Sequence, residues 1–288
     1  MQKVNYYIFR FFIGIFSIFS FWQLYVFSDI LCFFIYRVAG YRKKIVFENL
    51  RNSFPEKQED EISMIANGFY HHLTDVITES MKAFSMPEET VIQRYRYIGM
   101  DALNALFRQN QSVICVAGHF NNWEWGGIAS DQQMLHTPVG FYQPLSNKYT
   151  DAYVRRRRVR GKSKLASVLR TSETFRQYLG SPHIFYMIAD QSPSSPRLSY
   201  WVNFLNQDTA TLHGPEKYAR LYNYPVFYAD VQKVKRGYYT VSFIPLTLDP
   251  SSTQHGEITG MFMHKLEEKI RENPSSYLWS HRRWKLKR

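Results

Sequence analysis

The chain has 288 residues, of which 45% are hydrophobic and 17% aromatic, so it is long enough to build a sizeable core in one large α/β domain or two small ones. Its formal net charge of +12 favours acidic partners, which are nucleic acid, acidic lipid headgroups or an acidic protein. With only Cys32 and Cys115, in different apolar segments and outside any C-x2-C or H-E-x-x-H pattern, the chain lacks support for a disulfide or a zinc site.

The N-terminal segment is the longest apolar stretch. Residues 11–28 carry no charge, Asp29 interrupts the run, and ILCFFIY follows. About 20 apolar residues span a bilayer core, so we expect residues 1–40 to form a membrane anchor that spans the bilayer or lies deep in its interface. The alternatives are a core helix and a cleaved signal peptide, although the segment is too long and too aromatic for a signal peptide. More basic residues follow the segment than precede it, which places residues 41–288 on the cytoplasmic side.

The segments after the anchor predict an alternation of helices and strands. Residues 40–57 suggest an amphipathic helix that ends at Pro55, and residues 59–84 carry the apolar stripe of a second helix. His71 and His72 lie on that helix, where surface or packing roles are more common than metal binding. SVICVA (residues 112–117) suits a buried parallel strand, and a helix is expected from Asn122.

The second half of the chain continues this alternation. We expect strands at residues 136–142, 183–190 and 201–205, helices at 172–179 and 214–223, a hairpin around Arg236-Gly237, and a last helix over 257–274. The basic stretch over 147–164 is a helix or a loop, and a Ser/Pro-rich loop covers 191–197. The pattern predicts an α/β fold with a mixed, mostly parallel sheet flanked by helices.

The run GHFNNWEW, residues 118–125, carries the strongest chemical signal. His119 leaves the predicted strand, and Glu124 follows it with four residues between them. An imidazole can take a proton from a hydroxyl, while a carboxylate orients the ring and stabilises the imidazolium. We place His119 in the loop and Glu124 in the first helical turn, with Gly118 allowing a tight turn and Asn121 or Asn122 capping the helix. The alternative is a structural histidine that is hydrogen-bonded to a nearby acid.

The run GHFNNWEW resembles the motif of the lipid A late acyltransferases, the lauroyl/myristoyl transferase family within the lysophospholipid acyltransferase superfamily. Five further elements resemble this family in the same order: the post-anchor GYRKKIVFENLRNSFPE, YQPLSNKYTDAYVRRRR, ADQSP, FLNQDTATLHGPEKYA and the ending YLWSHRRWK. The resemblance covers nearly the whole chain. It implies a glycerolphosphate acyltransferase-like fold and a bacterial inner-membrane enzyme.

The resemblance implies transfer of an acyl chain from an acyl-thioester on acyl carrier protein to a hydroxyl of a membrane lipid. The acceptor lipid would be a lipid A precursor. The reaction would need no metal or other cofactor. His119 would be the base and Glu124 would hold its tautomer. An arginine of VRRRRVR, Arg156 or Arg158, would stabilise the oxyanion. Asp190 and Gln191 end a strand near the end of the His119 strand, and with Asn122 they are candidates for substrate binding. Arg282 and Arg283 either meet lipid phosphates or lie on the surface.

Other readings stay open at this point. Gln143 stands where the family often has Arg, and FLN replaces FFG, so the acceptor is alternatively a lysophospholipid or an aminolipid, with acyl-CoA as a possible donor. A second alternative is a non-catalytic lipid-binding membrane protein. A nucleic-acid binder is disfavoured by the apolar segment and by the absence of a known binding motif.

Overall fold

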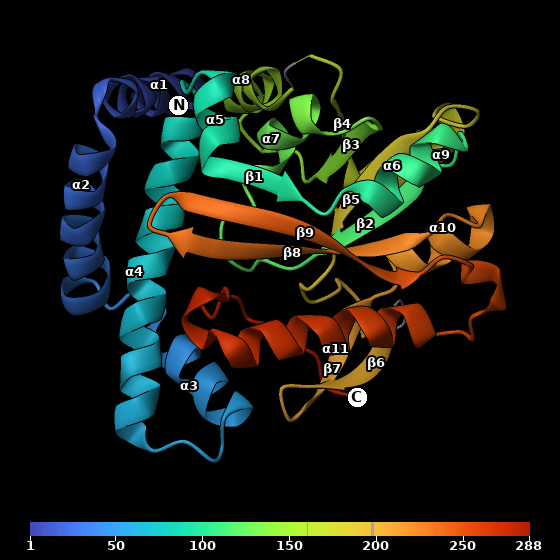
Figure 1. Ribbon diagram of the computed structural model, residues 1–288. Coiled ribbons are helices and arrows are strands. Elements are labelled where there is room, and N and C mark those ends of the chain that lie inside the picture. Colours follow the sequence, from blue (N-terminus) through green and yellow to red (C-terminus); the bar gives the residue numbers. More distant parts are fainter. Residues whose placement is uncertain (160, 197–198) are drawn as a thin grey trace.

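A seven-stranded sheet forms the centre of the computed structural model, which describes residues 1–159, 161–196 and 199–288 (Figure 1). The strand order is β1 (Tyr95–Ile98), β9 (Tyr238–Thr247), β8 (Val226–Lys235), β2 (Val113–Ala117), β5 (His183–Ile188), β3 (Thr137–Tyr142) and β4 (Lys164–Ser167). Within this sheet the β8–β9 hairpin is antiparallel and the other described pairs are parallel. The predicted mixed, mostly parallel sheet is confirmed.

Helices cover both faces of the sheet, and the residues of β2 explain why. Val113 and Cys115 pack into one buried cluster and Ile114 and Val116 into the other, so this strand is apolar on both sides. The first face is covered by α5 (Glu88–Arg94), α6 (Asp101–Arg108) and α7 (Gly126–Gln133), whose buried residues join the first cluster. The opposite face is covered by α9 (Thr171–Gln177), α10 (Gly214–Tyr222) and α11 (Glu257–Glu272).

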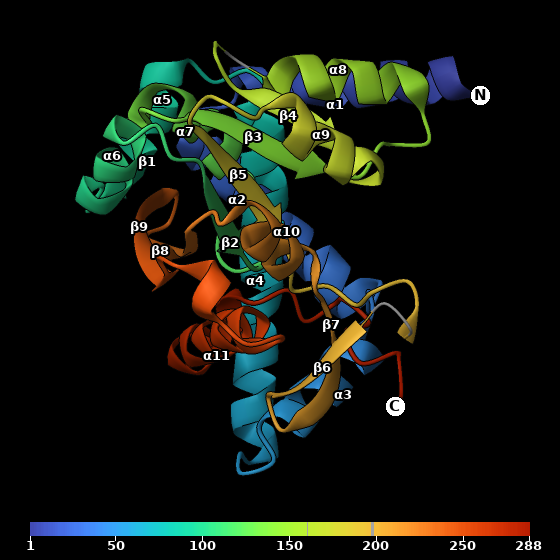
Figure 2. The same ribbon diagram turned by 90° about the vertical axis from the view of Figure 1, so that its right-hand side faces the viewer.

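A second, two-stranded sheet packs beside this core, near α3 (Lys43–Ser53), as Figure 2 shows. Strands β6 (Ser199–Phe204) and β7 (Gln207–Leu212) are joined by Leu205 and Asn206, both at positive φ. Two such residues form the tight hairpin loop whose twist matches the flanking strands. The sequence predicts only the first of these strands, because the polar run of β7 lacks a clear apolar alternation.

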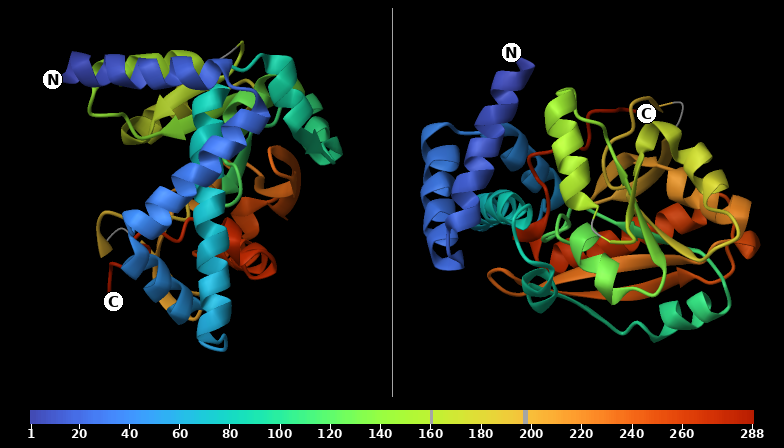
Figure 3. Two further views of the ribbon diagram at one scale, coloured as in Figure 1. Left: turned by 90° about the vertical axis from the view of Figure 1, so that its left-hand side faces the viewer. Right: turned by 90° about the horizontal axis from the view of Figure 1, so that it is seen from above.

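The second helix of the chain runs along α4 (Glu59–Ala83), a long helix that stands at one end of the sheet, whereas the first helix lies across one end of α4 (Figure 3). The uncharged run 11–28 is not one helix: α1 (Gln2–Ile18) ends inside it, and α2 (Phe21–Phe33) continues as a π-helical turn, Phe34–Val38. Ser20 breaks the run, because its side chain caps α2 and its backbone N–H donates to the Gln23 side chain. Within the described residues, one helical segment, Phe21–Val38, is long and apolar enough to cross a membrane.

The remaining elements complete the frame. Helix α8 (Lys148–Arg158) lies beside α1 (Figure 3). The predicted basic stretch is therefore a helix up to Arg158. Residue 160 of that stretch and Arg197 of the Ser/Pro-rich loop lie outside the described residues. Short 3-10 turns occur at Val168–Arg170, Pro250–Ser252 and Pro274–Ser276. The last of these leads into a C-terminal segment that returns to the end of β2.

Candidate active site

The register of two neighbouring strands places His119 beside Asp190. In the parallel pair β2–β5, Ala117 lies opposite Ile188, and the Ala189 N–H donates to the Ala117 carbonyl at 3.1 Å. His119 and Asp190 each follow two residues after those strand ends. The His119 N–H donates to Asp190 Oδ2 at 3.0 Å, and His119 Nδ1 lies 2.7 Å from Asp190 Oδ1. Asp190 therefore holds both the backbone and the ring of His119.

The charge balance favours an ionised Asp190. Burial alone would raise the pKa of this carboxyl, which is 2% exposed, but the adjacent His119 and the cation of Arg283 hold the pKa below its ordinary value. Burial likewise opposes the charged form of His119, while the charge and hydrogen bond of Asp190 and the charge of Glu124 raise the pKa of the imidazole above its ordinary value. The pair is thus arranged to accept a proton on His119.

The tautomer follows from these contacts. An ionised carboxylate only accepts hydrogen bonds, so Nδ1 of His119 carries the proton. Its Nε2 keeps a lone pair and lies 3.2 Å from the side-chain nitrogen of Gln191, which donates to it. An unprotonated Nε2 is what a general base requires. In this structure the side chain of Gln191 occupies the position next to Nε2.

Glu124 sits differently from the arrangement expected on sequence grounds. The hydrogen bond to His119 Nδ1 comes from Asp190, whereas Glu124 pairs with Arg158 at 2.5 Å and acts on His119 through its charge. The ring of Trp123 packs edge-on against the imidazole, with 4.9 Å between the ring centroids. The role of Glu124 as the orienting acid stays a prediction.

The turn that carries Glu124 precedes its helix. The sequence places Glu124 in the first helical turn, but α7 begins only at Gly126, because Asn121 adopts a left-handed conformation with φ of 53°. Asn122 caps the turn: its Oδ1 accepts from the N–H groups of Glu124 and Trp125, both at 3.1 Å. Asn122 is fully buried and supports the turn, while its role in substrate binding stays a prediction.

Gly118 is needed for space and not for a special backbone angle. A Cβ at this position would lie 2.7 Å from Leu266 Cδ1 on α11. Real Cβ atoms do not approach other heavy atoms so closely, so a side chain here would force the buried side chain of Leu266 to move.

The two candidate arginines are separated by the structure. Arg158, the last residue of α8, turns inward to Glu124, whereas Arg156 is exposed. Arg156 lines a surface groove between α1 and α8, together with Tyr6, Arg10 and Lys148. Only Arg158 therefore meets the GHFNNWEW motif.

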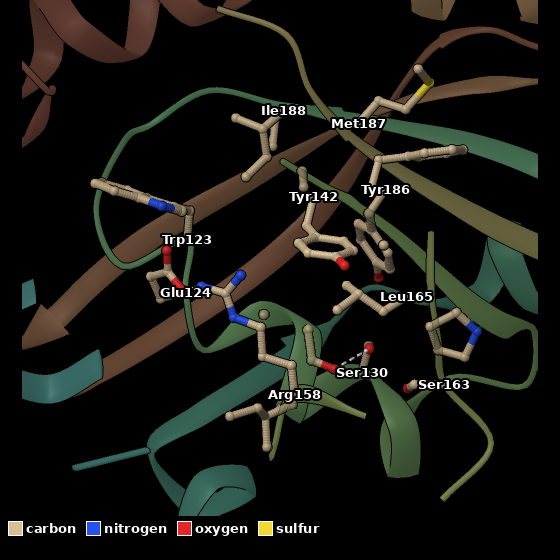
Figure 4. A pocket seen from close by; sticks show the side chains of 18 of the residues that line it. Trp123, Glu124, Ser130, Tyr142, Arg158, Ser163, Leu165, Tyr186, Met187 and Ile188 are labelled. Atoms are coloured by element: carbon tan, nitrogen blue, oxygen red, sulfur yellow. Dashed lines mark hydrogen bonds and ion pairs between the residues drawn. The ribbon is translucent and has the colours of Figure 1, made fainter. Parts of the chain in front are cut away.

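An apolar cavity of about 150 Å³ opens beside this cluster (Figure 4). Trp123, Glu124 and Arg158 line one side of it. Its other walls come from the first face of the sheet and from α7, and they include Tyr95, Tyr97, Gly140, Tyr142, Leu165, Tyr186, Met187, Ile188, Val231 and Val241. A narrow apolar slot next to charged side chains suits a fatty acyl chain whose reacting end is polar.

The C-terminal segment closes the site from the other side. Tyr277 pairs with Phe120 in an antiparallel bridge, and the Leu278 N–H donates to the His119 carbonyl at 3.2 Å. Arg283 is buried, donates to the Ala210 carbonyl at 2.6 Å and lies close enough to Asp190 to stabilise its charge. Arg282 is exposed. The sequence did not predict whether Arg283 is buried or exposed, and the resemblance of the ending YLWSHRRWK to the family was the only signal for this residue.

Within residues 1–159, 161–196 and 199–288, His, Cys, Asp and Glu side chains do not gather in any group of three that could hold a metal ion.

Comparison with known proteins gives the same assignment as the motifs. The family model of the bacterial lipid A biosynthesis acyltransferases matches residues 1–286. A lipid A biosynthesis palmitoleoyltransferase of Escherichia coli K12 is 25% identical over 275 residues, which cover 90% of this chain and 86% of the relative. A lipid A biosynthesis lauroyltransferase of the same organism is 25% identical over 250 residues, covering 85% and 80%. The chain therefore belongs to the bacterial lipid A biosynthesis acyltransferase family and is an acyltransferase.

Proposed function

We propose that this enzyme transfers a fatty acyl chain from acyl carrier protein to a hydroxyl of a lipid A precursor, with His119 as the general base. The observation that supports this most is the His119 imidazole beside an apolar cavity, with Nδ1 held by Asp190 and an unprotonated Nε2 that accepts from Gln191. The names of the relatives support the acceptor. The net charge of +12 suits both an acidic carrier protein and lipid phosphates.

The chemistry is a direct acyl transfer. His119 Nε2 removes the proton of the acceptor hydroxyl as its oxygen attacks the thioester carbonyl carbon. Arg158 stabilises the negative oxygen of the tetrahedral intermediate, and Glu124 holds that guanidinium in place. When the intermediate collapses, the C–S bond breaks, and the imidazolium returns its proton to the thiolate. The products are an ester and a free thiol.

The same residues suggest where each substrate part lies. The acyl chain fills the cavity behind Trp123 and Glu124. The acceptor approaches from the carboxyl edge of the sheet, where Asp190, Gln191 and Gln143 follow β5 and β3. Gln143 stands where the family often has Arg, so this residue is the first to examine if the acceptor is a lysophospholipid or an aminolipid.

We also propose that residues 1–40 anchor the enzyme to the inner membrane, with residues 41–288 as the catalytic domain on the cytoplasmic side. Helices α1 and α2 expose a row of large apolar side chains, and most of the apolar window Phe21–Val38 is not buried within the protein. The exposed apolar residues of α1 and α2 are Val4, Tyr7, Ile8, Phe11, Phe12, Ile18, Trp22, Val26, Ile30 and Phe33. Contiguous apolar surface of this kind is typical of membrane contact.

Transfer assays with membranes that carry the enzyme test this proposal. Acyl carrier protein and CoA thioesters serve as donors, and lipid A precursor, lysophospholipids and aminolipids as acceptors. The His119→Ala variant should lose about 10²–10⁴-fold in activity, while His264→Ala, at an exposed histidine of α11, should keep it. Transfer that survives His119→Ala would remove the base. No transfer to any acceptor would favour a non-catalytic lipid-binding protein.

Chain-length choice gives a second test. Gly140 lines the cavity, and a Cβ there would meet only Leu165, at an ordinary 3.6 Å. Gly140→Leu should therefore fill part of the slot without disturbing β3. We expect the preferred acyl chain to become shorter, with about tenfold or more lost for each methylene that no longer fits. Competition between acyl donors of graded length measures this shift. Gly260→Leu on α11, where a Cβ meets nothing within 4 Å, is the control.

A further inference from the structure

The carboxyl group of Glu79, on α4, lies behind the turn that carries Glu124 and takes no part in the chemistry described above. Glu79 is 0% exposed. Tyr25 donates to its Oε1 at 2.8 Å, and Tyr239 and Asn122 donate to its Oε2 at 2.9 and 2.6 Å. A buried carboxyl group is costly unless such donors satisfy it, so this one fixes the positions of three side chains from three separate parts of the chain.

Asn122 transmits the position of Glu79 to the catalytic turn. Its Nδ2 is committed to Glu79, and its Oδ1 accepts from the backbone N–H groups of Glu124 and Trp125. The orientation of the amide is therefore fixed at both ends. Trp125 adds a second link, because its indole N–H donates to the Glu79 carbonyl at 3.0 Å. Any shift of Glu79 would move the turn and with it the Glu124–Arg158 pair.

The other end of this network lies on the membrane-anchor helix α2. Tyr25 and Ser28 face α4, where Ser28 donates to Asp75 at 2.8 Å. Phe21 contacts the Trp125 ring at 6.4 Å between centroids. Trp22, Val26 and Ile30, on the opposite side of the same helix, are exposed. One face of α2 thus supports the catalytic turn while the other offers apolar surface.

We propose that Tyr25, Glu79 and Asn122 form a positioning relay that fixes the Glu124 turn only while α2 is seated against α4. The relay rests on the function proposed above, because it acts through Glu124 and Arg158. It predicts that the membrane anchor contributes to turnover as well as to attachment. None of the three residues lines the cavity, so their loss should lower kcat and leave the KM for the acyl donor nearly unchanged.

The mildest test is Tyr25→Phe, which removes one hydroxyl and keeps the ring. We expect kcat to fall about five- to tenfold, in line with the loss of one hydrogen bond to a buried carboxyl group, with an unchanged KM and unchanged sedimentation with the membrane fraction. Tyr7→Phe is the matched control, because Tyr7 is exposed on α1. A Tyr25→Phe enzyme with wild-type kcat would overturn the relay.

A reciprocal exchange tests the Glu79–Asn122 bond itself. Asn122→Asp places two carboxyl groups against each other and should lower kcat about 10- to 100-fold. Adding Glu79→Gln places an amide N–H at position 79 against the carboxylate at position 122, so one donor again faces one acceptor. The kcat of the double variant should therefore recover to within about fivefold of wild type. Failure to recover, in a double variant that unfolds at the wild-type temperature, would contradict the relay. An inactive wild-type enzyme would instead overturn the proposed function, and the relay with it.

Discussion

Replacing Asp190 with asparagine is expected to lower acyl transfer by about 10²–10⁴-fold. Asp190 accepts two hydrogen bonds from His119, one from the backbone N–H and one from Nδ1. An asparagine has one oxygen for these two donors. If that oxygen keeps the backbone contact, the amide nitrogen faces Nδ1 and drives the proton to Nε2, which is the tautomer that cannot act as a base. The imidazolium also loses its counter-charge.

The pH profile of this variant gives an independent check. The base works in its neutral form, so activity falls as the pH drops through the pKa of His119. Because Asp190 raises the pKa of His119, the wild-type acidic limb should lie above the ordinary imidazole range. In Asp190→Asn that limb should move to lower pH, because burial then dominates. An unmoved limb together with full kcat would show that Asp190 does not support the base.

Replacing Arg158 with methionine is expected to cost about 10²–10³-fold in kcat, the range found when one donor to an oxyanion is removed. Arg158 pairs with Glu124 at 2.5 Å and lines the cavity. Methionine keeps much of the packing of the side chain but removes its charge. Single-turnover measurement of acyl transfer would report the chemical step directly.

The control lies two residues away on the same helix. Arg156→Met removes an equal charge from the exposed groove between α1 and α8, so kcat should stay within about twofold of wild type. Equal losses in the two variants would mean that the basic run acts through its overall charge. A loss confined to Arg156→Met would place the oxyanion donor outside the cluster around Glu124.

The sequence predicts His119 at the end of a strand because the signals are local: an apolar run, a glycine and a run of polar residues. The contact between His119 and Asp190 is not local. It depends on β5 lying between β2 and β3 in the sheet, although β3 comes before β5 along the chain. Strand order is decided by the packing of the whole sheet, so both residues are predicted as site candidates while their bond is not.

The same limit applies to Glu124 and to the N-terminal region. The pairing of Glu124 with Arg158 joins residues that lie 34 positions apart, through a helix packed against a loop.

The apolar composition of residues 11–28 predicts a single anchor helix, because hydropathy does not register the capping box of Ser20 and Gln23. The hydrogen bonds of Ser20 start a new helix within a run that is otherwise uniformly apolar.

The joint between α1 and α2 bears on how deep the anchor sits. Backbone groups that a helix break leaves open are costly in a lipid environment unless the protein satisfies them itself. Here the N–H of Ser20 donates to the Gln23 side chain, the N–H of Gln23 donates to the Ser20 hydroxyl, and the ammonium group of Lys82 donates to the carbonyls of Ser17 and Phe19, both at 2.7 Å. The protein itself therefore satisfies several of the backbone groups at the bend. If residues 1–40 anchor the enzyme as proposed, α1 and α2 enter the lipid headgroup region as two helices whose joint is already held by α4.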